Sequence, residues 1–206
     1  MSRVLIVDYG LCNLDSVSRA IEECGGSAFV TDQPSAARTA SRIILPGVGS
    51  FNEGIRCIRK MGWDEALTEE VLGAGIPILG ICLGMQLLAS QGDEGGVTQG
   101  LGFIPGRVVR LEEKDDERIP HIGWNEVHQM SRDIPIFEGI SQDKDFYFVH
   151  SYHLCPQDQG HVLATTPYCG SFVSAAGHGN ILGTQFHPEK SLGIGFQLLK
   201  NFLKYY

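Results

Sequence analysis

The stretch IPILGICLGMQ, residues 76–86, decides the fold of this chain. Residues 76–81 form a short apolar run that is typical of a buried strand, and residues 83–90 favour a helix. Cys82 stands between them, flanked by Gly80 and Gly84. A strand that turns directly into a helix needs glycine on both sides, because a Cβ there would collide with neighbouring backbone. Gly-x-Cys-x-Gly is the thiol counterpart of the Gly-x-Ser-x-Gly nucleophile elbow, so the stretch predicts an α/β fold with a cysteine nucleophile at a helix N-terminus.

The sequence before this stretch alternates predicted strands with predicted helices. Strands are expected at residues 3–8, 28–30 and 42–45, and helices at 14–24, 34–40 and 51–72, the last with a break near Gly62. This alternation is typical of a parallel sheet with helices on both faces.

The second half of the sequence changes character and is rich in strands joined by turns. We expect strands at residues 103–111, 125–129, 145–150, 162–166, 172–176 and 181–187, followed by a helix at 194–205. There is no internal repeat and no low-complexity linker. We therefore predict one domain over residues 1–206, with a mixed, mostly parallel central sheet flanked by helices and smaller antiparallel strands in the second half.

Composition excludes several classes of partner. The 206 residues suffice for one domain with a substantial core, and the formal net charge of -8 comes without any basic cluster. This argues against nucleic acid and against a membrane surface. No apolar stretch is long enough to span a bilayer, and no signal peptide is recognisable. The acidic run at residues 112–117 is interpreted as a solvated loop.

The cysteines and histidines show no metal-binding pattern. The six cysteines form no Cys-x-x-Cys pair, and the seven histidines lack ligand spacing, so no metal is expected. Without a secretory signal, we interpret the cysteines as reduced thiols of a cytoplasmic protein. Cys82 alone stands in a context that indicates chemistry.

A cysteine nucleophile needs a base, an orienting acid and donors for an oxyanion. His187 ends a predicted strand, and Glu189 follows two residues later, near enough to hold its imidazole. The amide of Leu83 is a natural oxyanion donor. The Pro46-Gly47-Val48-Gly49 turn after the third predicted strand is a second candidate, because its glycines let peptide groups turn toward a substrate.

Three motifs together resemble one family. The segments PGVG (46–49), GICLGMQ (80–86) and HPE (187–189) appear in the order found in the class I, or triad, glutamine amidotransferases. The resemblance implies that this fold hydrolyses L-glutamine without a cofactor, through the triad Cys82, His187 and Glu189. It further implies an oxyanion and substrate site made of Gly47, Val48, Gly49, Leu83, Gln86, Ser151 and Tyr152.

Further segments narrow the resemblance. VDYG (7–10), PHIGWN (120–125), YFVHSY (147–152) and HPEKS (187–191) are similar to segments of the glutaminase subunits of imidazole glycerol phosphate synthases. That resemblance implies a heterodimer with a (β/α)8-barrel cyclase, which uses the ammonia in histidine biosynthesis. The matching interface positions are Asn13, His121, Trp124, Asn125, Tyr147 and Lys190.

Three alternatives remain open from the sequence. Paralogous amidotransferases that supply ammonia for amidine formation on bacterial surface sugars would carry the same motifs. A stand-alone cysteine hydrolase would turn over its substrate without a partner. A non-enzymatic binding or redox-sensing module would need neither the triad nor Gln86.

Overall fold

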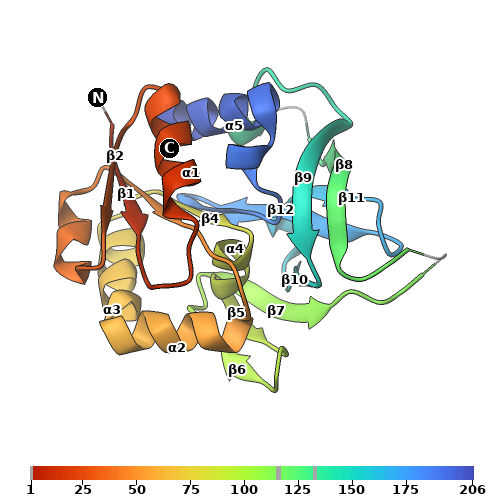
Figure 1. Ribbon diagram of the computed structural model, residues 1–206, viewed down its shortest axis with the longest axis horizontal. Coiled ribbons are helices and arrows are strands. Elements are labelled where there is room, and N and C mark those ends of the chain that lie inside the picture. The colour runs from red at the N-terminus through yellow and green to blue at the C-terminus, as the bar shows by residue number, and fades with distance from the viewer. Residues whose placement is uncertain (1, 115–116, 132–133) are drawn as a thin grey trace.

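A mixed nine-stranded sheet organises the computed structural model, which describes residues 2–114, 117–131 and 134–206 (Figure 1). Its strand order is β2-β1-β3-β4-β13-β12-β11-β8-β9. Parallel pairing joins β2 (Ser27–Thr31), β1 (Arg3–Val7), β3 (Arg42–Leu45), β4 (Ile78–Ile81) and β13 (Ile181–Thr184). Antiparallel pairing adds β12 (Phe172–His178), β11 (Val162–Thr166), β8 (His121–Gln129) and β9 (Lys144–His150).

The predicted α/β fold with a mixed sheet is confirmed. The sheet contains more antiparallel pairing than the sequence predicted. Four pairings are parallel and four are antiparallel, so the parallel part makes up one half of the sheet. The parallel half comes from the alternating first part of the chain and from β13. The antiparallel half comes from the strand-rich second part.

Helices cover both faces of the parallel half (Figure 1). One face carries α1 (Leu14–Glu23) and α5 (Leu192–Tyr205), and the other carries α2 (Phe51–Met61), α3 (Trp63–Leu67) and α4 (Leu83–Leu87). Strand β1 shows why, because Val4 and Ile6 pack toward α1 and α5 while Leu5 and Val7 pack toward α2 to α4. All four are fully buried, as expected for a strand covered on both sides.

Short helical segments occur in both halves of the chain. The predicted helix at residues 34–40 is a 3-10 helix, η1 (Pro34–Thr39). The predicted long helix breaks at Gly62 as expected, and it ends in a π-helical segment, η2 (Thr68–Gly73). Further 3-10 turns are η3 (Pro135–Phe137), η4 (Gln159–His161) and η5 (Pro188–Lys190).

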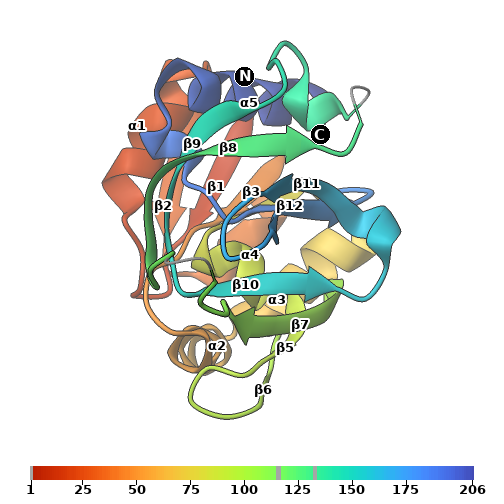
Figure 2. The ribbon, with the colours of Figure 1, turned by 90° about the vertical axis from the view of Figure 1, so that its right-hand side faces the viewer.

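A second sheet, absent from the sequence prediction, packs on the face that carries α2 and α4 (Figure 2). It has the order β10-β7-β5-β6, formed by β10 (Tyr152–Pro156), β7 (Ile104–Arg110), β5 (Ala89–Gly92) and β6 (Thr98–Gln99). The helix predicted for residues 83–90 therefore ends at Leu87. The carbonyls of Leu88 and Ala89 accept hydrogen bonds from Ile104 and Gly102, both at 2.9 Å, so long-range strand pairing prevails over local helix preference.

Two strand ends also differ from the prediction. The strand predicted to reach residue 187 ends at Thr184, because the His187 amide instead bonds to the Tyr147 carbonyl of β9 at 2.9 Å. Strand β8 begins at His121, four residues earlier than expected, because it pairs with β9 over its first seven residues. Asp115 and Asp116 of the predicted acidic loop lie outside the described residues. Within the described parts, no helix is long and apolar enough to cross a membrane.

The turn between β4 and α4 has the geometry of a nucleophile elbow. Cys82 adopts φ 55° and ψ −110°, a conformation that side chains rarely occupy. Its neighbours have no room for a side chain. A Cβ on Gly84 would lie 1.7 Å from the Leu45 carbonyl oxygen, and one on Gly80 would lie 2.7 Å from the Gly84 carbonyl oxygen. The two glycines therefore let α4 start directly against β3 and β4.

We predict that Gly84→Ala lowers the free energy of unfolding by about 3 kcal/mol, because the added Cβ meets rigid main chain that cannot move aside. Chemical denaturation measures this difference. Gly73→Ala is the matched control, since nothing lies within 4 Å of its added Cβ, and we expect a change of at most about 1 kcal/mol. Equal losses in both variants would contradict the role of Gly84 in the elbow.

Candidate active site

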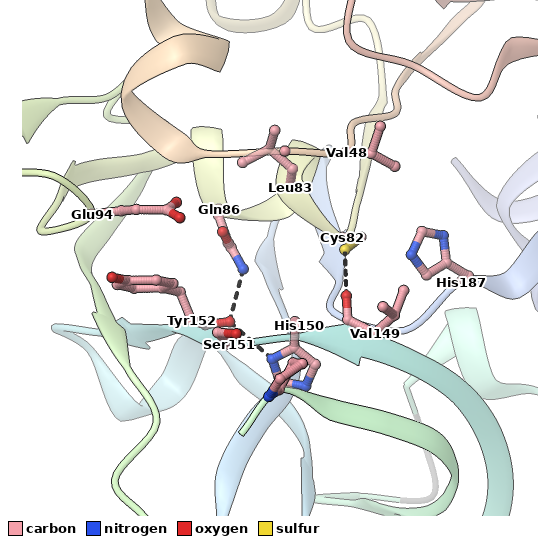
Figure 3. Close-up of a pocket in the computed structure, with 12 residues that line it drawn as sticks. Val48, Cys82, Leu83, Gln86, Glu94, Val149, His150, Ser151, Tyr152 and His187 are labelled. Carbon is pink, nitrogen blue, oxygen red and sulfur yellow. Dashed lines mark hydrogen bonds between the residues drawn. The ribbon is translucent and has the colours of Figure 1, made fainter. Parts of the chain in front are cut away.

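A cavity of about 290 Å³ opens beside Cys82, at the carboxyl end of β4 (Figure 3). Open α/β sheets bind their ligands at this edge. Most of the residues proposed from the sequence for catalysis and substrate binding line this cavity, namely Val48, Gly49, Cys82, Leu83, Gln86, Ser151, Tyr152 and His187. The wall also includes Glu94, Pro120, Val149 and His150. Glu189 and Gly47 lie behind the wall, next to His187 and Val48 in a smaller cavity.

Cys82 carries the backbone strain of the site. A non-glycine residue in such a conformation costs of the order of 1–3 kcal/mol, and such strain concentrates where function needs it. Its amide is fixed by the Thr184 carbonyl at 2.7 Å. The thiol donates to the Val149 carbonyl at 3.7 Å and accepts from the Gln185 side-chain amide, also at 3.7 Å. The buried sulfur is thereby held at the cavity wall.

His187 and Glu189 form a buried pair beside the sulfur. The Glu189 Oε1 atom accepts from His187 Nδ1 at 2.7 Å, and the side chains are 4% and 2% exposed. Nδ1 therefore carries a proton, and Nε2, which has no hydrogen-bond partner among the described residues, is the atom available to the cavity. Burial opposes charge on this imidazole, but the Cys82 sulfur and the Glu189 carboxylate outweigh burial and raise its pKa to about 9.

The loop at residues 46–49 lies against Cys82, but its Val48 amide is hydrogen-bonded away from the sulfur. The buried Tyr9 hydroxyl donates to the Pro46 carbonyl at 2.9 Å, which fixes the start of the loop. The Val48 amide donates to the Leu11 carbonyl at 2.9 Å, so it does not point at the sulfur. The Leu83 amide, in the first turn of α4, has no acceptor within its helix and lies next to the sulfur.

The opposite end of the cavity is polar. Gln86 donates through Nε2 to the Tyr152 carbonyl at 2.8 Å and to Gln185 Oε1 at 3.0 Å. Glu94 faces the same end, and its Oε2 accepts from the Phe51 amide at 2.8 Å (Figure 3). Sequence reasoning missed Glu94, because only the pairing of β5 with β7 brings the loop after β5 to the cavity. No local motif marks it.

The residues predicted to meet a partner lie in three places. Trp124 is 48% exposed, packs edge-on to Tyr147 at 6.0 Å between ring centroids, and Lys190 Nζ lies 5.9 Å from the Tyr147 ring. These three form a cluster beside His187 in which Trp124 is exposed and Tyr147 and Lys190 are half-buried. His121 is buried and Asn125 partly buried beneath it, so in this conformation the His121 side chain offers no surface to another molecule. Asn13 precedes α1 and lies beside Glu189 in the smaller cavity.

Chemically, the cavity combines a strained thiol, a histidine oriented by a carboxylate and a nearby amide donor. This is the equipment for acyl transfer through a covalent intermediate. In the described parts of the chain, no three His, Cys, Asp or Glu side chains come together in an arrangement that could hold a metal ion.

Comparison with known proteins agrees with this chemistry. The family model "Glutamine amidotransferase class-I" matches residues 5–205. The imidazole glycerol phosphate synthase subunit HisH 1 of Campylobacter jejuni is 45% identical over 201 residues, covering 98% of this chain and 99% of that protein. The corresponding HisH subunit of Syntrophotalea carbinolica is 43% identical over 204 residues, covering 97% and 98%.

Solved structures share the architecture at lower identity. The structure of PurLQS from Thermotoga maritima superposes with a TM-score of 0.79 at 19% identity, covering 100% of this chain and 99% of that one. The family predicted from the sequence motifs is therefore confirmed. The chain belongs to the class-I glutamine amidotransferase family, in its HisH branch.

Proposed function

We propose that this chain is the glutaminase subunit of an imidazole glycerol phosphate synthase. It hydrolyses L-glutamine to glutamate and ammonia and passes the ammonia to a cyclase subunit in histidine biosynthesis. The observation that carries the proposal is that the strained Cys82 and His187 line one cavity, with Glu189 hydrogen-bonded to His187 from behind the wall. The names of the relatives favour this pathway over amidine formation on surface sugars. We propose the cytoplasm as its compartment, since all six cysteines are free thiols.

The reaction begins from the ion pair in which the Cys82 thiol has passed its proton to His187 Nε2, and the sulfur attacks the side-chain carboxamide carbon of glutamine. The carbonyl oxygen takes the displaced electron pair and becomes an oxyanion, which the amides of Leu83 and Val48 stabilise. His187, charged by virtue of its raised pKa of about 9, gives the Nε2 proton to the departing nitrogen. The carbon–nitrogen bond breaks, ammonia leaves, and a γ-glutamyl thioester remains on Cys82.

Water then completes the turnover. Neutral His187 takes a proton from the water molecule as its oxygen attacks the thioester carbon. The carbon–sulfur bond breaks, glutamate is released, and Cys82 and His187 return to their starting state. Glu189 keeps the imidazole in the tautomer that exposes Nε2 throughout both halves of the reaction.

Substrate binding uses the polar end of the cavity. Gly49, Gln86 and the backbone at Ser151 and Tyr152 contact the amino-acid end of glutamine. The Glu94 carboxylate faces the same region, and its charge is complementary to the substrate's α-ammonium group. Its hydrogen bond to Phe51 fixes its orientation before the substrate arrives.

Ammonia release depends on the partner. One oxyanion donor, the Val48 amide, is engaged by the Leu11 carbonyl at 2.9 Å, so one peptide must turn before the site is complete. The partner is a (β/α)8-barrel cyclase in a heterodimer, which meets the chain at Trp124, Tyr147 and Lys190 together with Asn13, and His121 and Asn125 support this interface from beneath. Docking beside the loop at residues 46–49 favours the turned state and so raises the rate.

The first prediction concerns the nucleophile. Cys82→Ala is expected to reduce glutamine-dependent synthesis by the complex about 10⁴-fold or more, because no covalent intermediate forms. Synthesis from added ammonium salts should persist. Steady-state assays with each nitrogen source measure both activities. Cys57→Ala, a half-buried thiol on α2, is the control and should retain both. Loss of the ammonia-supported activity in Cys82→Ala would contradict the assignment.

The second prediction concerns the partner. Glutamate release by the isolated chain should rise about 5- to 150-fold when the cyclase and its ligand are added, in the usual range of coupling between sites. Trp124→Ala should weaken binding of the cyclase about tenfold or more, as expected for a buried aromatic anchor. Val30→Ala changes an exposed residue on β2, at the far edge of the sheet, and should leave both values unchanged. Equal turnover with and without the cyclase would refute partner dependence.

The third prediction concerns pH. The charged form of His187 is the proton donor, and its pKa of about 9 means that this form is present below pH 9 and disappears above it. Values of kcat/KM should therefore fall above about pH 9. Glu189→Gln removes one cause of the raised pKa, so the falling limb should move to lower pH by about one unit or more. Glu138→Gln, at an exposed ion pair with Lys204, is the control. If kcat/KM of Glu189→Gln fell at the same pH as in the unsubstituted chain, Glu189 would not be a cause of the raised pKa of His187.

A further inference from the structure

Two buried histidines lie opposite each other beneath the cavity and share a hydrogen bond. His121 of β8 and His150 of β9 are cross-strand partners, and His121 Nδ1 lies 3.1 Å from His150 Nε2. Each of the two histidines has a second hydrogen-bond partner. His150 Nδ1 lies 2.9 Å from the Tyr152 carbonyl oxygen, and Asn125 Nδ2 lies 3.4 Å from His121 Nε2. We call these four groups, from Asn125 through the histidines to the Tyr152 carbonyl, the imidazole chain.

The direction of every hydrogen bond in the imidazole chain follows from the Tyr152 carbonyl at one end. The Tyr152 carbonyl can only accept, so His150 Nδ1 carries the proton and the His150 Nε2 atom of the neutral ring accepts. His121 must then donate through Nδ1, which leaves its Nε2 to accept from the Asn125 side-chain amide. One tautomer of each neutral ring therefore satisfies the whole chain.

The surroundings keep both rings neutral and fixed. His121 stacks on Tyr168 with ring centroids 3.9 Å apart, and Phe172 packs edge-on against His150 at 4.7 Å. Burial lowers the pKa of His121 to about 4 and that of His150 to about 3. Both rings are more than nine-tenths buried.

The Tyr152 carbonyl is where the imidazole chain meets the cavity. It accepts from His150 on one side and from Gln86 Nε2, at 2.8 Å, on the other (Figure 3). The residues on both sides of His150 also form the cavity wall. Val149 offers its carbonyl to the Cys82 thiol, and Ser151 lines the substrate end. A movement of His150 would therefore displace the backbone that faces both ends of the substrate.

We propose that His150, oriented by His121, is a positioning residue for glutamine binding. It holds the Tyr152 carbonyl in place, and through that carbonyl it sets Gln86 and the backbone of residues 151–152. This inference rests on the proposed glutaminase function and deepens it. His150 takes no part in proton transfer, because both ring nitrogens are engaged within the imidazole chain. The other end of the imidazole chain is Asn125, the sequence neighbour of the exposed Trp124.

The kinetic test uses two substitutions of His150 in the full chain with its cyclase. His150→Leu removes both hydrogen bonds and should raise KM for glutamine about tenfold, since it leaves a buried carbonyl with one donor fewer. Turnover at saturating glutamine should stay within about threefold. His150→Asn keeps a donor near Nδ1 and should restore most of the KM. His178→Asn is the matched control, because this imidazole donates to the Phe103 carbonyl far from the cavity.

Chemical labelling of Cys82 separates positioning from general damage. A diazoketone analogue of glutamine needs the substrate site, whereas iodoacetamide needs only the thiol. His150→Leu should slow labelling by the analogue about tenfold and leave labelling by iodoacetamide within about twofold. If the wild-type chain were not labelled by the analogue, the proposed function itself would fail. If it were labelled and His150→Leu were labelled equally fast, only the positioning role would fail.

A measurement on the unsubstituted chain keeps the inference testable if His150→Leu does not fold. Nitrogen-15 NMR of the imidazoles at pH 7 should find both His121 and His150 neutral, with the proton on Nδ1. Protons on Nε2 in either ring would break the chain of donors and overturn the proposal. His121→Leu, one step further from the cavity, should raise KM about threefold by freeing the His150 ring. An unchanged KM in that variant would also count against it.

Discussion

The contact between Gly84 and the Leu45 carbonyl is the constraint on which the site depends. A Cβ at residue 84 would come within 1.7 Å of that oxygen, so α4 can begin only where β3 and β4 lie side by side. The same contact fixes two things at once. It sets the start of α4 directly after Cys82, whose backbone is strained, and it places Gly47, in the loop that follows β3, against Leu83 and Gly84. Nucleophile and oxyanion loop are thus positioned by one close approach of backbone.

Local patterns revealed the parts of the fold and site that are encoded over a few residues. The elbow, the strands at 3–8 and 42–45 and the pair at His187 and Glu189 each lie within one short segment, and the structure contains them. Strands β5, β6 and β10 escaped prediction because their pairing partners are distant in sequence. Glu94 escaped for the same reason. The direction of the Val48 amide is a conformational choice that no pattern of residue types records.

The site contains two kinds of buried histidine, and their partners decide the charge. His187 and His150 both lie in surroundings that disfavour a charged ring. His187 has the Glu189 carboxylate and the Cys82 sulfur beside it, and its pKa rises to about 9. His150 has only a neutral ring and a carbonyl as partners, so burial dominates and lowers its pKa to about 3. In the roles proposed above, the same residue type thus serves proton transfer at His187 and rigid positioning at His150, on two sides of one cavity.

Control of the reaction needs little free energy in this arrangement. Turning the Val48 peptide breaks its hydrogen bond to Leu11, and a single such bond contributes only about 1 kcal/mol net. Coupling between two binding sites is typically about 1–3 kcal/mol. Under the proposed function, a partner that binds the cluster of Trp124, Tyr147 and Lys190 therefore supplies enough free energy to complete the oxyanion site. The cluster is well placed, because the Tyr147 carbonyl holds the backbone of His187 itself at 2.9 Å. Under the proposed function, a chain that keeps its second donor engaged until a partner arrives releases ammonia only where it is used.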